Sequence, residues 1–444
     1  MRPPRDVTIH SIDAEGNGLG TDDRGLDWRI RGAPPGAVVR AVGRPKLGYR
    51  IGLVSPPPDG LTPPCPAFGM CGGCVWQELP LDRQRAEKHA AVNRLVADLG
   101  GVDHGVVGED AAYGWRNKVE LSFGVDRFLA QDNREAERIG RWLGYHPPGR
   151  FDRIVDLEGC LLVEPAMDAV YRRIRADVLG TDFPFWNPRD HTGFFRHLGL
   201  RTGNEGVLVT LYTAPPDEEQ AAWLAERAPH WGGAGVVWVV SDARADAAVG
   251  TVRAVLHGQP TVSTRLGAIA IQLSSSAFFQ VNHAAAGRLA ALVADWVGPA
   301  AVLWDLYCGT GILGLACAAR VGKVYGIEIN AASVEDARAT AARNGVDATF
   351  VAGEVEKLVG TLPRPDAVIV DPPRAGLHPE ALRVVAGLDA DVLVYVACRP
   401  SSLARDGMAL RVAGWTCTDR ICVDIFPQTA HIEVITRWVR SPRC

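Results

Sequence analysis

The segment YVACRPSSLARD, residues 395–406, places Cys398 between an apolar run and the expected start of a helix. Pro400 followed by two serines is typical of the first turn of a helix. The positive end of the helix dipole favours a thiolate, so we expect a lowered pKa for Cys398, with Arg399 and Arg405 adding to the effect. A lone cysteine is more often a small buried hydrophobe, so the rest of the chain must decide whether this one is a nucleophile.

A glycine-rich turn lies in DLYCGTGILG, residues 305–314. Gly309 and Gly311 allow a tight turn between a strand and a helix, with close approach to a ligand. Glu328 ends the next strand, where a carboxylate can accept both ribose hydroxyls of a nucleoside. This spacing fits a nicotinamide dinucleotide and a methyl donor equally well. Asp305 favours S-adenosylmethionine, because enzymes that use it usually carry an acid there.

The segment VIVDPPRAGLH places Asp371, Pro372 and Pro373 directly after another apolar strand. Open α/β sheets bind ligands at the carboxyl ends of their strands, and prolines there hold a loop in a fixed conformation. In methyltransferases that act on amino groups, an aromatic residue usually follows the two prolines. Arg374 follows them here, which argues against an amine as the methyl acceptor.

Glu433 lies in the apolar segment TAHIEVITRW, residues 429–438. A carboxylate in a dry strand has a raised pKa and suits proton abstraction. Methylation of uracil at C5 needs a thiolate and a base. A thiolate adds to C6 and makes C5 nucleophilic toward a sulfonium methyl group, and a base then removes the C5 proton so that the thiolate can leave. Cys398 and Glu433 are the candidates for these two roles.

A separate group of cysteines, Cys65, Cys71 and Cys74, lies in CPAFGMCGGC. An iron–sulfur cluster or a structural zinc ion requires four thiolates. Cys160 is the expected fourth ligand, since the cysteines near the glycine-rich turn belong to the cofactor region. The spacing alone favours neither metal over the other.

The order of the expected elements divides the chain into three regions. Residues 1–56 read as short strands with glycine turns, which predicts a small β-barrel followed by a proline-rich linker. Residues 57–270 mix strands and helices and predict an α+β domain that includes the cysteine segment. In residues 271–444 apolar strands alternate with helices, which predicts a doubly wound α/β sheet.

The composition is that of a soluble globular protein, with 47% hydrophobic and 22% charged residues. No apolar stretch has the ~18 residues of a membrane span, and the first residues lack the apolar core of a signal peptide. We therefore expect a cytoplasmic protein without a membrane partner. In a reducing compartment the 10 cysteines indicate metal binding or catalysis rather than disulfides. A net charge of −4 requires any nucleic-acid binding to use a local basic patch.

Together these motifs resemble the uracil-C5 RNA methyltransferases, which form 5-methyluridine in ribosomal and transfer RNA. The resemblance covers nearly the whole chain: a TRAM-like barrel, CGGC, FFQVN, DLYCGTG, GIE, DPPRAGL, YVACRP with LARD, and HIE. It implies a class I, Rossmann-like methyltransferase domain after a central RNA-binding domain and an OB-like TRAM barrel. Two positions depart from the family, which usually has Asn at Arg399 and Asp at Glu354. Neither departure affects the reaction class.

The resemblance also implies roles for single residues. Cys398 would be the nucleophile and Glu433 the base. The side chains that would contact S-adenosylmethionine are Gln280, Tyr307, Glu328 and Asp371, beside Asp305, Gly309 and Gly311 of the glycine-rich turn. A 4Fe–4S cluster with a structural role would be held by Cys65, Cys71, Cys74 and Cys160, with zinc as the alternative.

Three basic and aromatic segments are candidate RNA contacts: RPKLGYR, YGWRNKVELSF and GFFRHLGLR. Phosphates attract Lys and Arg, and a base that is to be modified must leave its stack. The basic residues and the histidine in the last two segments are Arg116, Lys118, Arg196, His197 and Arg201.

We therefore expect a monomeric S-adenosylmethionine-dependent RNA (uracil-C5) methyltransferase. Ribosomal RNA, of the 23S type, is the favoured substrate, because the bacterial tRNA-specific branch usually lacks the cysteine cluster. Transfer RNA is the first alternative. Two others come from different classes: a nicotinamide-dependent iron–sulfur oxidoreductase, which leaves Cys398 and Asp371 unused, and a non-catalytic RNA-binding module, against which the intact Cys398 and Glu433 argue.

Overall fold

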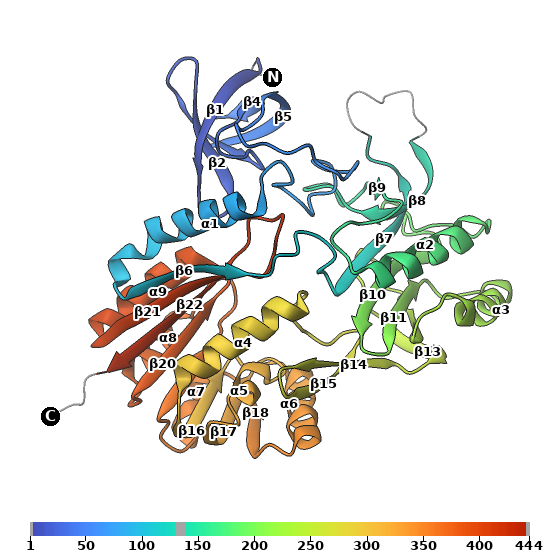
Figure 1. Ribbon diagram of the computed structural model, residues 1–444. Helices are drawn as coiled ribbons and strands as arrows, with labels where there is room; N and C mark the ends of the chain where they lie inside the picture. Colours follow the sequence, from blue (N-terminus) through green and yellow to red (C-terminus); the bar gives the residue numbers. More distant parts are fainter. Residues whose placement is uncertain (1–2, 130–137, 441–444) are drawn as a thin grey trace.

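The computed structural model describes residues 3–129 and 138–440 (Figure 1). An N-terminal barrel and a central mixed sheet lie beside a large C-terminal sheet with helices on its faces (Figure 1). These sheets confirm the predicted doubly wound α/β unit and the barrel that precedes it. None of the helices among the described residues has the length and apolar character needed to cross a membrane.

The barrel closes in the strand order β1-β2-β3-β5-β4. Alternate residues of its strands point inward, as the period of a half-buried strand requires, and bury Val7, Ile30 and Val39 completely. Its strands are β1 (Arg5–Ile12), β2 (Asn17–Asp22), β3 (Asp27–Arg31), β4 (Val38–Arg44) and β5 (Leu47–Ser55).

The central sheet has the order β13-β12-β11-β10-β7-β8-β9. A helix begins after Asp217, whose carboxylate accepts the Gln220 N–H in a capping box. The strands are β7 (Lys118–Asp126), β8 (Ile139–Tyr145), β9 (Val155–Asp156), β10 (Phe195–Gly203), β11 (Gly206–Thr213), β12 (Gly235–Val240) and β13 (Thr251–Gly258). The helices of this region are α2 (Pro165–Leu179), α3 (Glu218–Arg227) and the 3-10 helix Ala228–His230. A hairpin of β14 (Thr261–Leu266) and β15 (Ile269–Ser274) leads to the C-terminal sheet.

The C-terminal sheet has the order β18-β17-β16-β19-β20-β22-β21-β6. Its first five strands are parallel, and β22 pairs antiparallel with both β20 and β21. The strands are β16 (Ala300–Leu306), β17 (Val321–Glu328), β18 (Ala348–Ala352), β19 (Ala367–Val370), β20 (Val392–Ala397), β21 (Trp415–Asp424) and β22 (Glu433–Arg440). The helices are α4 (His283–Val297), α5 (Ile312–Ala316), α6 (Ala331–Asn344), α7 (Val355–Leu358), α8 (Pro379–Gly387), α9 (Pro400–Val412) and the 3-10 helix Val359–Thr361.

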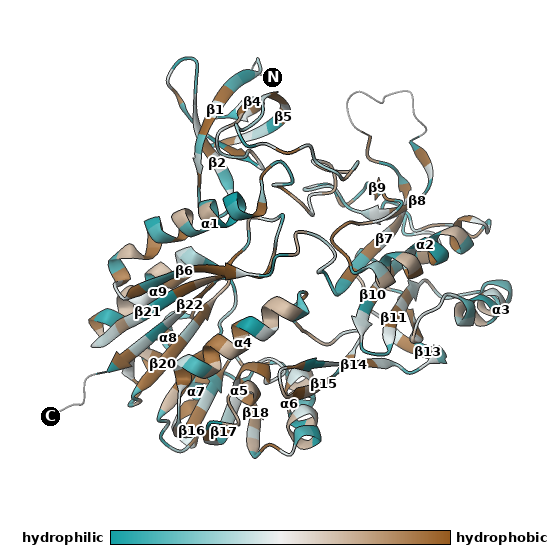
Figure 2. Ribbon diagram, viewed as in Figure 1, coloured by the Kyte–Doolittle hydropathy of each residue, from teal (hydrophilic) through white to brown (hydrophobic). Residues whose placement is uncertain are grey.

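The core of this unit lies between the sheet and its helices. Figure 2 shows brown, hydrophobic strands in the sheet and teal segments on the exposed faces of α1 and α2. Leu303, Val368 and Leu393 are completely buried, as expected for parallel strands covered on both faces.

Two elements before the central sheet belong to the C-terminal unit. They are α1 (Leu81–Val96), which is followed by the 3-10 helix Ala97–Leu99, and β6 (Val102–Gly108). The helix packs against α9, and β6 pairs in parallel with β21 and covers what would be an open sheet edge. The sequence analysis placed both within 57–270, whereas the structure places them on the other side of the molecule from the central sheet (Figure 1). The domain boundaries themselves stay a prediction.

Candidate active site

A cavity of about 960 Å³ opens at the carboxyl ends of β16, β17, β19 and β20. Nearly all the predicted site residues line it: Gln280, Asp305, Tyr307, Gly309, Glu328, Asp371, Cys398 and Glu433. Gly311 does not line the cavity. It is the N-cap of α5, with φ of 75°. A Cβ at Gly311 would lie 2.7 Å from the Phe350 ring, so the position requires glycine.

Glu328 is fixed at the end of β17 by two backbone amides. Its Oε2 accepts a hydrogen bond from the Gly309 N–H at 3.1 Å, and its Oε1 accepts one from the Asn330 N–H at 2.8 Å. The carboxylate therefore lies beside the glycine-rich turn, and its remaining lone pairs are available to two ribose hydroxyls.

Asp305, at the end of β16, is completely buried. Its Oδ2 accepts the Gly314 N–H at 2.8 Å, while its Oδ1 has no hydrogen-bond partner among the described residues. Burial raises the pKa of this carboxyl to about 7, and the nearby Asp371 and Glu328 add to the shift. A buried acceptor without a partner costs free energy, so this oxygen favours a ligand that brings a cationic donor, such as an amino acid ammonium.

The loop after β19 is fixed by hydrogen bonds, one of them to Asp406 of α9. The Gly376 N–H donates to the Pro373 carbonyl at 2.7 Å and closes a tight turn. The buried Asp406 accepts the Leu377 N–H at 2.8 Å and the Tyr395 hydroxyl at 2.7 Å. These bonds hold the loop that presents Asp371, whose pKa burial raises to about 7.

Cys398 and Glu433 come from neighbouring antiparallel strands. Ala397, the last residue of β20, pairs with Val434 of β22, and the same register places Cys398 opposite Glu433. Glu433 is buried and Cys398 is partly buried, and both face the cavity. The two groups that the chemistry needs therefore meet at the cavity that also contains the predicted methyl-donor residues.

The expected lowering of the Cys398 pKa is wrong. Burial raises the pKa of this thiol to about 11, and Glu433 and Asp371 raise it further, while Arg374 opposes them. Desolvation is the largest cause of this rise, and the two carboxylates add to it.

The two arginines expected to help Cys398 have other partners. Arg399 lies 3.4 Å from the Glu15 carboxylate of the barrel, and Arg405 pairs with Asp406 at 2.7 Å. The cation that acts on the thiol is Arg374 instead.

The prediction that the pKa of Glu433 is raised is confirmed. Burial holds the pKa of its carboxyl well above the ordinary value, Asp371 raises it further, and Arg374 lowers it. Arg374 therefore favours the ionised forms of both Cys398 and Glu433.

The sequence analysis gave no role to several residues that line the cavity. The Arg374 guanidinium lies with Nη2 3.3 Å from the His431 Nδ1. Burial, Arg374 and Lys88 lower the pKa of His431, so its imidazole is neutral near pH 7. The motifs DPPR and HIE contain both residues, but neither motif indicates that they contact each other. Other cavity residues without a predicted role include Phe278, Phe426 and Ile329.

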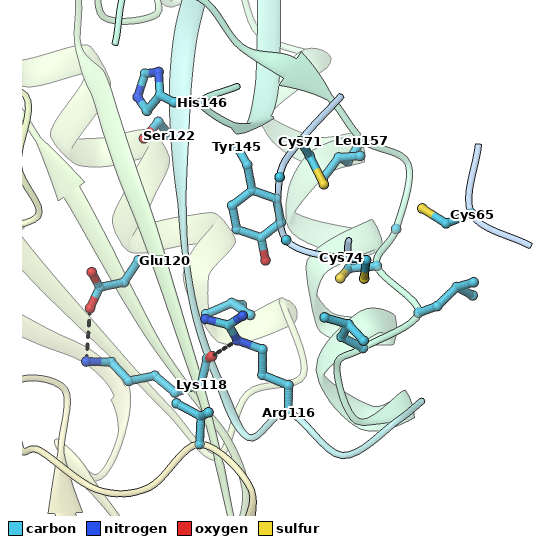
Figure 3. Close-up of a pocket in the computed structure, with 18 of the residues that line it drawn as sticks. Cys65, Cys71, Cys74, Arg116, Lys118, Glu120, Ser122, Tyr145, His146 and Leu157 are labelled. Atoms are coloured by element: carbon cyan, nitrogen blue, oxygen red, sulfur yellow. Dashed lines mark hydrogen bonds and ion pairs between the residues drawn. The ribbon is translucent and has the colours of Figure 1, made fainter. Parts of the chain in front are cut away.

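The four cysteines predicted as metal ligands line a second cavity, of about 560 Å³. Figure 3 shows Cys65, Cys71 and Cys74 on one side of it and Glu120 and Lys118 on the other. Burial raises the pKa of Cys74 to about 12, and Cys71, Cys160 and Cys65 add to the shift. Within 3–129 and 138–440, no three His, Cys, Asp or Glu side chains are grouped closely enough to hold a metal ion as they stand.

The two cavities share Arg116, Phe278, Phe279 and Val281 in their walls. Lys118 lines the cysteine cavity and pairs with Glu120 at 2.9 Å. The cysteine site therefore lies next to the cavity that holds Cys398.

Three predicted RNA contacts on β10 are wrong, because this strand lies inside the central sheet. Arg196 is completely buried and donates to the carbonyl oxygens of Ser241, Ala243 and Ala245. His197 and Arg201 are buried as well.

Taken together, the doubly wound sheet, the glycine-rich turn, the fixed carboxylate on β17 and the cavity at the strand ends define a class I S-adenosylmethionine-dependent methyltransferase. Residues 303–385 match a family model described as a methyltransferase domain. Residues 364–438 match the model of the tRNA (uracil-5-)-methyltransferases.

Relatives that match over most of their length are named as RNA methyltransferases. An uncharacterized RNA methyltransferase of Chlorobaculum tepidum is 31% identical over 413 residues, which cover 88% of this chain and 86% of the relative. Another, of Caldanaerobacter subterraneus, is 31% identical over 447 residues, 97% of each chain. The chain belongs to the family of these RNA methyltransferases.

A solved structure shows the same fold along nearly the entire chain. It is the tRNA (uracil-54, C5)-methyltransferase of Pyrococcus abyssi in complex with S-adenosyl-L-homocysteine, with a TM-score of 0.79 and 24% identity. The match covers 98% of this chain and 100% of the other. It supports the class I fold of the C-terminal sheet and its placement after an N-terminal barrel.

Proposed function

We propose that this protein methylates C5 of a uridine in RNA through a covalent bond between Cys398 and the base. The observation that carries the proposal is the opposed position of Cys398 and Glu433 at the end of the β20–β22 pair, at the same cavity as Asp305 and Glu328. A thiol alone in the core, or a carboxylate without a thiol, would not support this reaction.

The donor end of the cavity fits S-adenosylmethionine. Glu328 is fixed for the ribose, and the unpartnered Oδ1 of Asp305 suits a cationic amino group. When bound, this cofactor supplies an electrophilic methyl group. Binding of S-adenosylhomocysteine without binding of NADH separates this function from that of a nicotinamide-dependent oxidoreductase.

The acceptor end supplies a nucleophile and a base. After the Cys398 thiol releases its proton to solvent, its sulfur bonds to C6 of the uracil, and the electron pair of the C5–C6 double bond moves into an enolate. C5 can then take a methyl group from the donor, which would leave as S-adenosylhomocysteine. The Glu433 carboxylate then accepts the C5 proton, the bond between sulfur and C6 breaks, and the thiolate is regenerated. Burial disfavours both anions, and Arg374 opposes this effect at both groups.

RNA that contains 5-fluorouridine tests this proposal, because its C5 carries no proton for a base to remove. We expect the wild-type protein with S-adenosylmethionine to form a covalent complex that survives denaturing electrophoresis, and Cys398→Ala to form none. Cys417→Ala is the control, since its buried thiol lies on β21 and does not line the cavity. Trapping by Cys398→Ala would exclude the assigned nucleophile.

The Glu433→Gln variant separates the addition of Cys398 to the uracil from the release of the RNA. On natural uridine we expect this variant to transfer the methyl group and remain attached to the RNA, since no carboxylate accepts the C5 proton. Free turnover by Glu433→Gln would assign the base to another residue.

We infer that the substrate is ribosomal RNA, of the 23S type, rather than transfer RNA. The inference rests on the cysteine segment, which the tRNA-specific bacterial branch usually lacks. Deleting the gene and mapping 5-methyluridine in total RNA tests it. Loss of the mark from transfer RNA alone would overturn the inference.

We also propose that Cys65, Cys71, Cys74 and Cys160 hold a 4Fe–4S cluster that links the segment after the barrel to the central domain. The support is their shared cavity and a donor set made only of thiols. Protein purified without oxygen should contain iron and sulfide near four atoms each per chain. Stoichiometric zinc without iron would refute the cluster.

A further inference from the structure

The chain between β21 and β22, residues 425–432, leads directly into Glu433. We refer to these residues as the catalytic loop. Two of its side chains, Phe426 and His431, line the cavity of Cys398. The loop contains no regular helix or strand, so its position depends on contacts with other segments.

Gln84 of α1 bonds to this loop with both ends of its amide. The side chain is completely buried, its Oε1 accepts the Gln428 N–H at 2.9 Å, and its Nε2 donates to the Gln428 Oε1 at 3.0 Å. The same Nε2 lies 3.0 Å from the Trp76 carbonyl and 2.9 Å from that of Leu79. One amide thus joins α1, the segment before it and the catalytic loop.

Gln428 has a backbone conformation that needs such support. Its φ is 67°, which is uncommon for a residue other than glycine and persists only where surrounding contacts fix it. Its carbonyl also accepts the N–H groups of Val75 at 2.8 Å and Trp76 at 3.4 Å. These residues come directly after Cys74, so the cysteine segment contacts the same point of the loop.

Lys88 holds the other end of the loop, one turn along α1. Its Nζ lies 2.6 Å from the Asp424 Oδ1 and donates to the Phe426 carbonyl at 3.2 Å. The side chains of Lys88 and Asp424 are both fully buried, and Arg85 is a second partner of Asp424 at 3.4 Å. A buried ion pair with this many bonds fixes the geometry of the groups around it.

We propose that Gln84 and Lys88 are positioning residues for the methylation reaction, acting by fixing the catalytic loop so that Glu433 reaches the C5 proton. The inference rests on the function proposed above. Cys398 follows β20, which lies within the ladder of β19 and β22. Glu433 is the first residue of β22, where the pairing with Val423 of β21 ends and the catalytic loop joins the strand. Proton removal requires the base within hydrogen-bond reach of its target, so a displaced loop should slow release more than addition.

Gln84→Met and Lys88→Met test this, since both replacements keep the length of the side chain and remove its polar atoms. On RNA with natural uridine we expect each variant to accumulate the covalent protein–RNA complex, with release at least ~10-fold slower than in the wild type. Trapping on 5-fluorouridine RNA and affinity for S-adenosylhomocysteine should change less than ~2-fold, because Cys398, Asp305 and Glu328 lie outside the loop.

Two controls separate a positioning role of Gln84 and Lys88 from an effect on the stability of the protein. Lys88→Met/Asp424→Asn also removes the buried carboxylate that keeps only Arg85 as a partner once Lys88 is replaced, so its melting temperature should return toward that of the wild type while release stays slow. Arg227→Met breaks the partly buried ion pair, 2.7 Å long, between Arg227 on α3 and Asp177 on α2 of the central domain. It should lose stability without accumulating the complex.

The possible outcomes distinguish the positioning role of Gln84 and Lys88 from the proposed function. If Glu433→Gln accumulates the complex but the Gln84 and Lys88 variants release RNA at the wild-type rate, the positioning role is overturned while the proposed function stands. Recovery of release together with the melting temperature in the double variant also overturns it. If the wild type traps no 5-fluorouridine RNA, the proposed function fails and this inference fails with it.

Discussion

Two carboxyl groups at the donor end of the cavity, Asp305 and Asp371, have pKa values that burial raises to about 7. The ordinary value is near 4. Near neutral pH the folded protein therefore holds a proton on carboxyl groups that would be ionised in the unfolded chain. Such groups reduce stability and are retained where a ligand needs them.

The Asp305 carboxyl predicts a dependence of stability on pH. In the unfolded chain it ionises near pH 4, whereas in the folded protein it holds its proton up to about pH 7. Since the unfolded state then binds fewer protons, stability falls as pH rises across this window. Asp305→Asn should therefore gain in melting temperature over the wild type at pH 8 more than at pH 5, while S-adenosylhomocysteine affinity falls. Thermal melts at the two pH values and calorimetric titration measure both effects.

The exposed Asp182 provides the matched control for this experiment. Asp182→Asn should change the melting temperature equally at both pH values. An equal difference at pH 5 and pH 8 for Asp305→Asn would contradict the raised pKa.

At the scale of elements, the loop after β19 is the part whose geometry is most constrained. Gly376 has φ of 78°, and a Cβ there would lie 2.6 Å from the Asp406 Oδ2 and 2.9 Å from the Ser402 Cβ. The segment LARD, which the sequence analysis quoted without a role for its acid, supplies Asp406 as the clamp of this loop.

Gly376→Ala should displace the loop that carries Asp371. We expect a loss of about 2–3 kcal/mol in unfolding free energy, from backbone strain together with the clash. S-adenosylhomocysteine affinity should fall at least ~10-fold, because Asp371 moves with the loop. Denaturant titration and calorimetry measure these changes.

Gly414→Ala is the control for backbone strain alone. Its φ is 92° and no atom of the described residues lies within 4 Å of its Cβ position, so we expect a loss of about 1 kcal/mol with unchanged affinity. If both variants behave alike, the clamp on the Asp371 loop is not what fixes the donor site.

At the scale of the whole molecule, the barrel lies beside the catalytic cavity. Glu15 pairs with Arg399, the neighbour of Cys398, and a Cβ at Gly16 would overlap the Ala430 Cβ of the catalytic loop. Arg50, one of the basic residues expected to contact RNA, is instead paired with Glu78 at 2.5 Å. Arg44 and Lys46 remain exposed on the same edge of the barrel.

Arg44→Ala/Lys46→Ala should weaken RNA binding without affecting the donor site. Each cation that contacts a phosphate adds about one unit to the slope of log affinity against log salt, so we expect the slope to fall by about 2. Filter binding between 50 and 200 mM salt measures the slope, and S-adenosylhomocysteine affinity should stay constant.

Arg364→Ala/Arg383→Ala removes the same charge from exposed positions at and before α8. Its salt slope should equal that of the wild type. An equal loss of RNA affinity in both double variants would mean that the barrel edge has no specific role.

The sequence by itself determined the elements and grouped the candidate residues of the site. Alternating apolar strands and helices predict a doubly wound sheet, and residues at the ends of parallel strands must meet at one edge, which is why Asp305, Glu328 and Asp371 could be grouped without coordinates. The motifs around Cys398 and Glu433 carried the reaction class, because that chemistry requires these two residue types together.

Only the tertiary structure decided which groups are buried, charged and paired. The pKa of Cys398 is raised rather than lowered, because the thiol is partly buried and Glu433 and Asp371 come from distant segments to lie near it. Arg196 and Arg201 resemble RNA contacts in the sequence and are buried in the central sheet. The pairing of β6 with β21 and the contact between Gln84 and Gln428, 344 residues apart, depend on long-range packing that no local pattern contains.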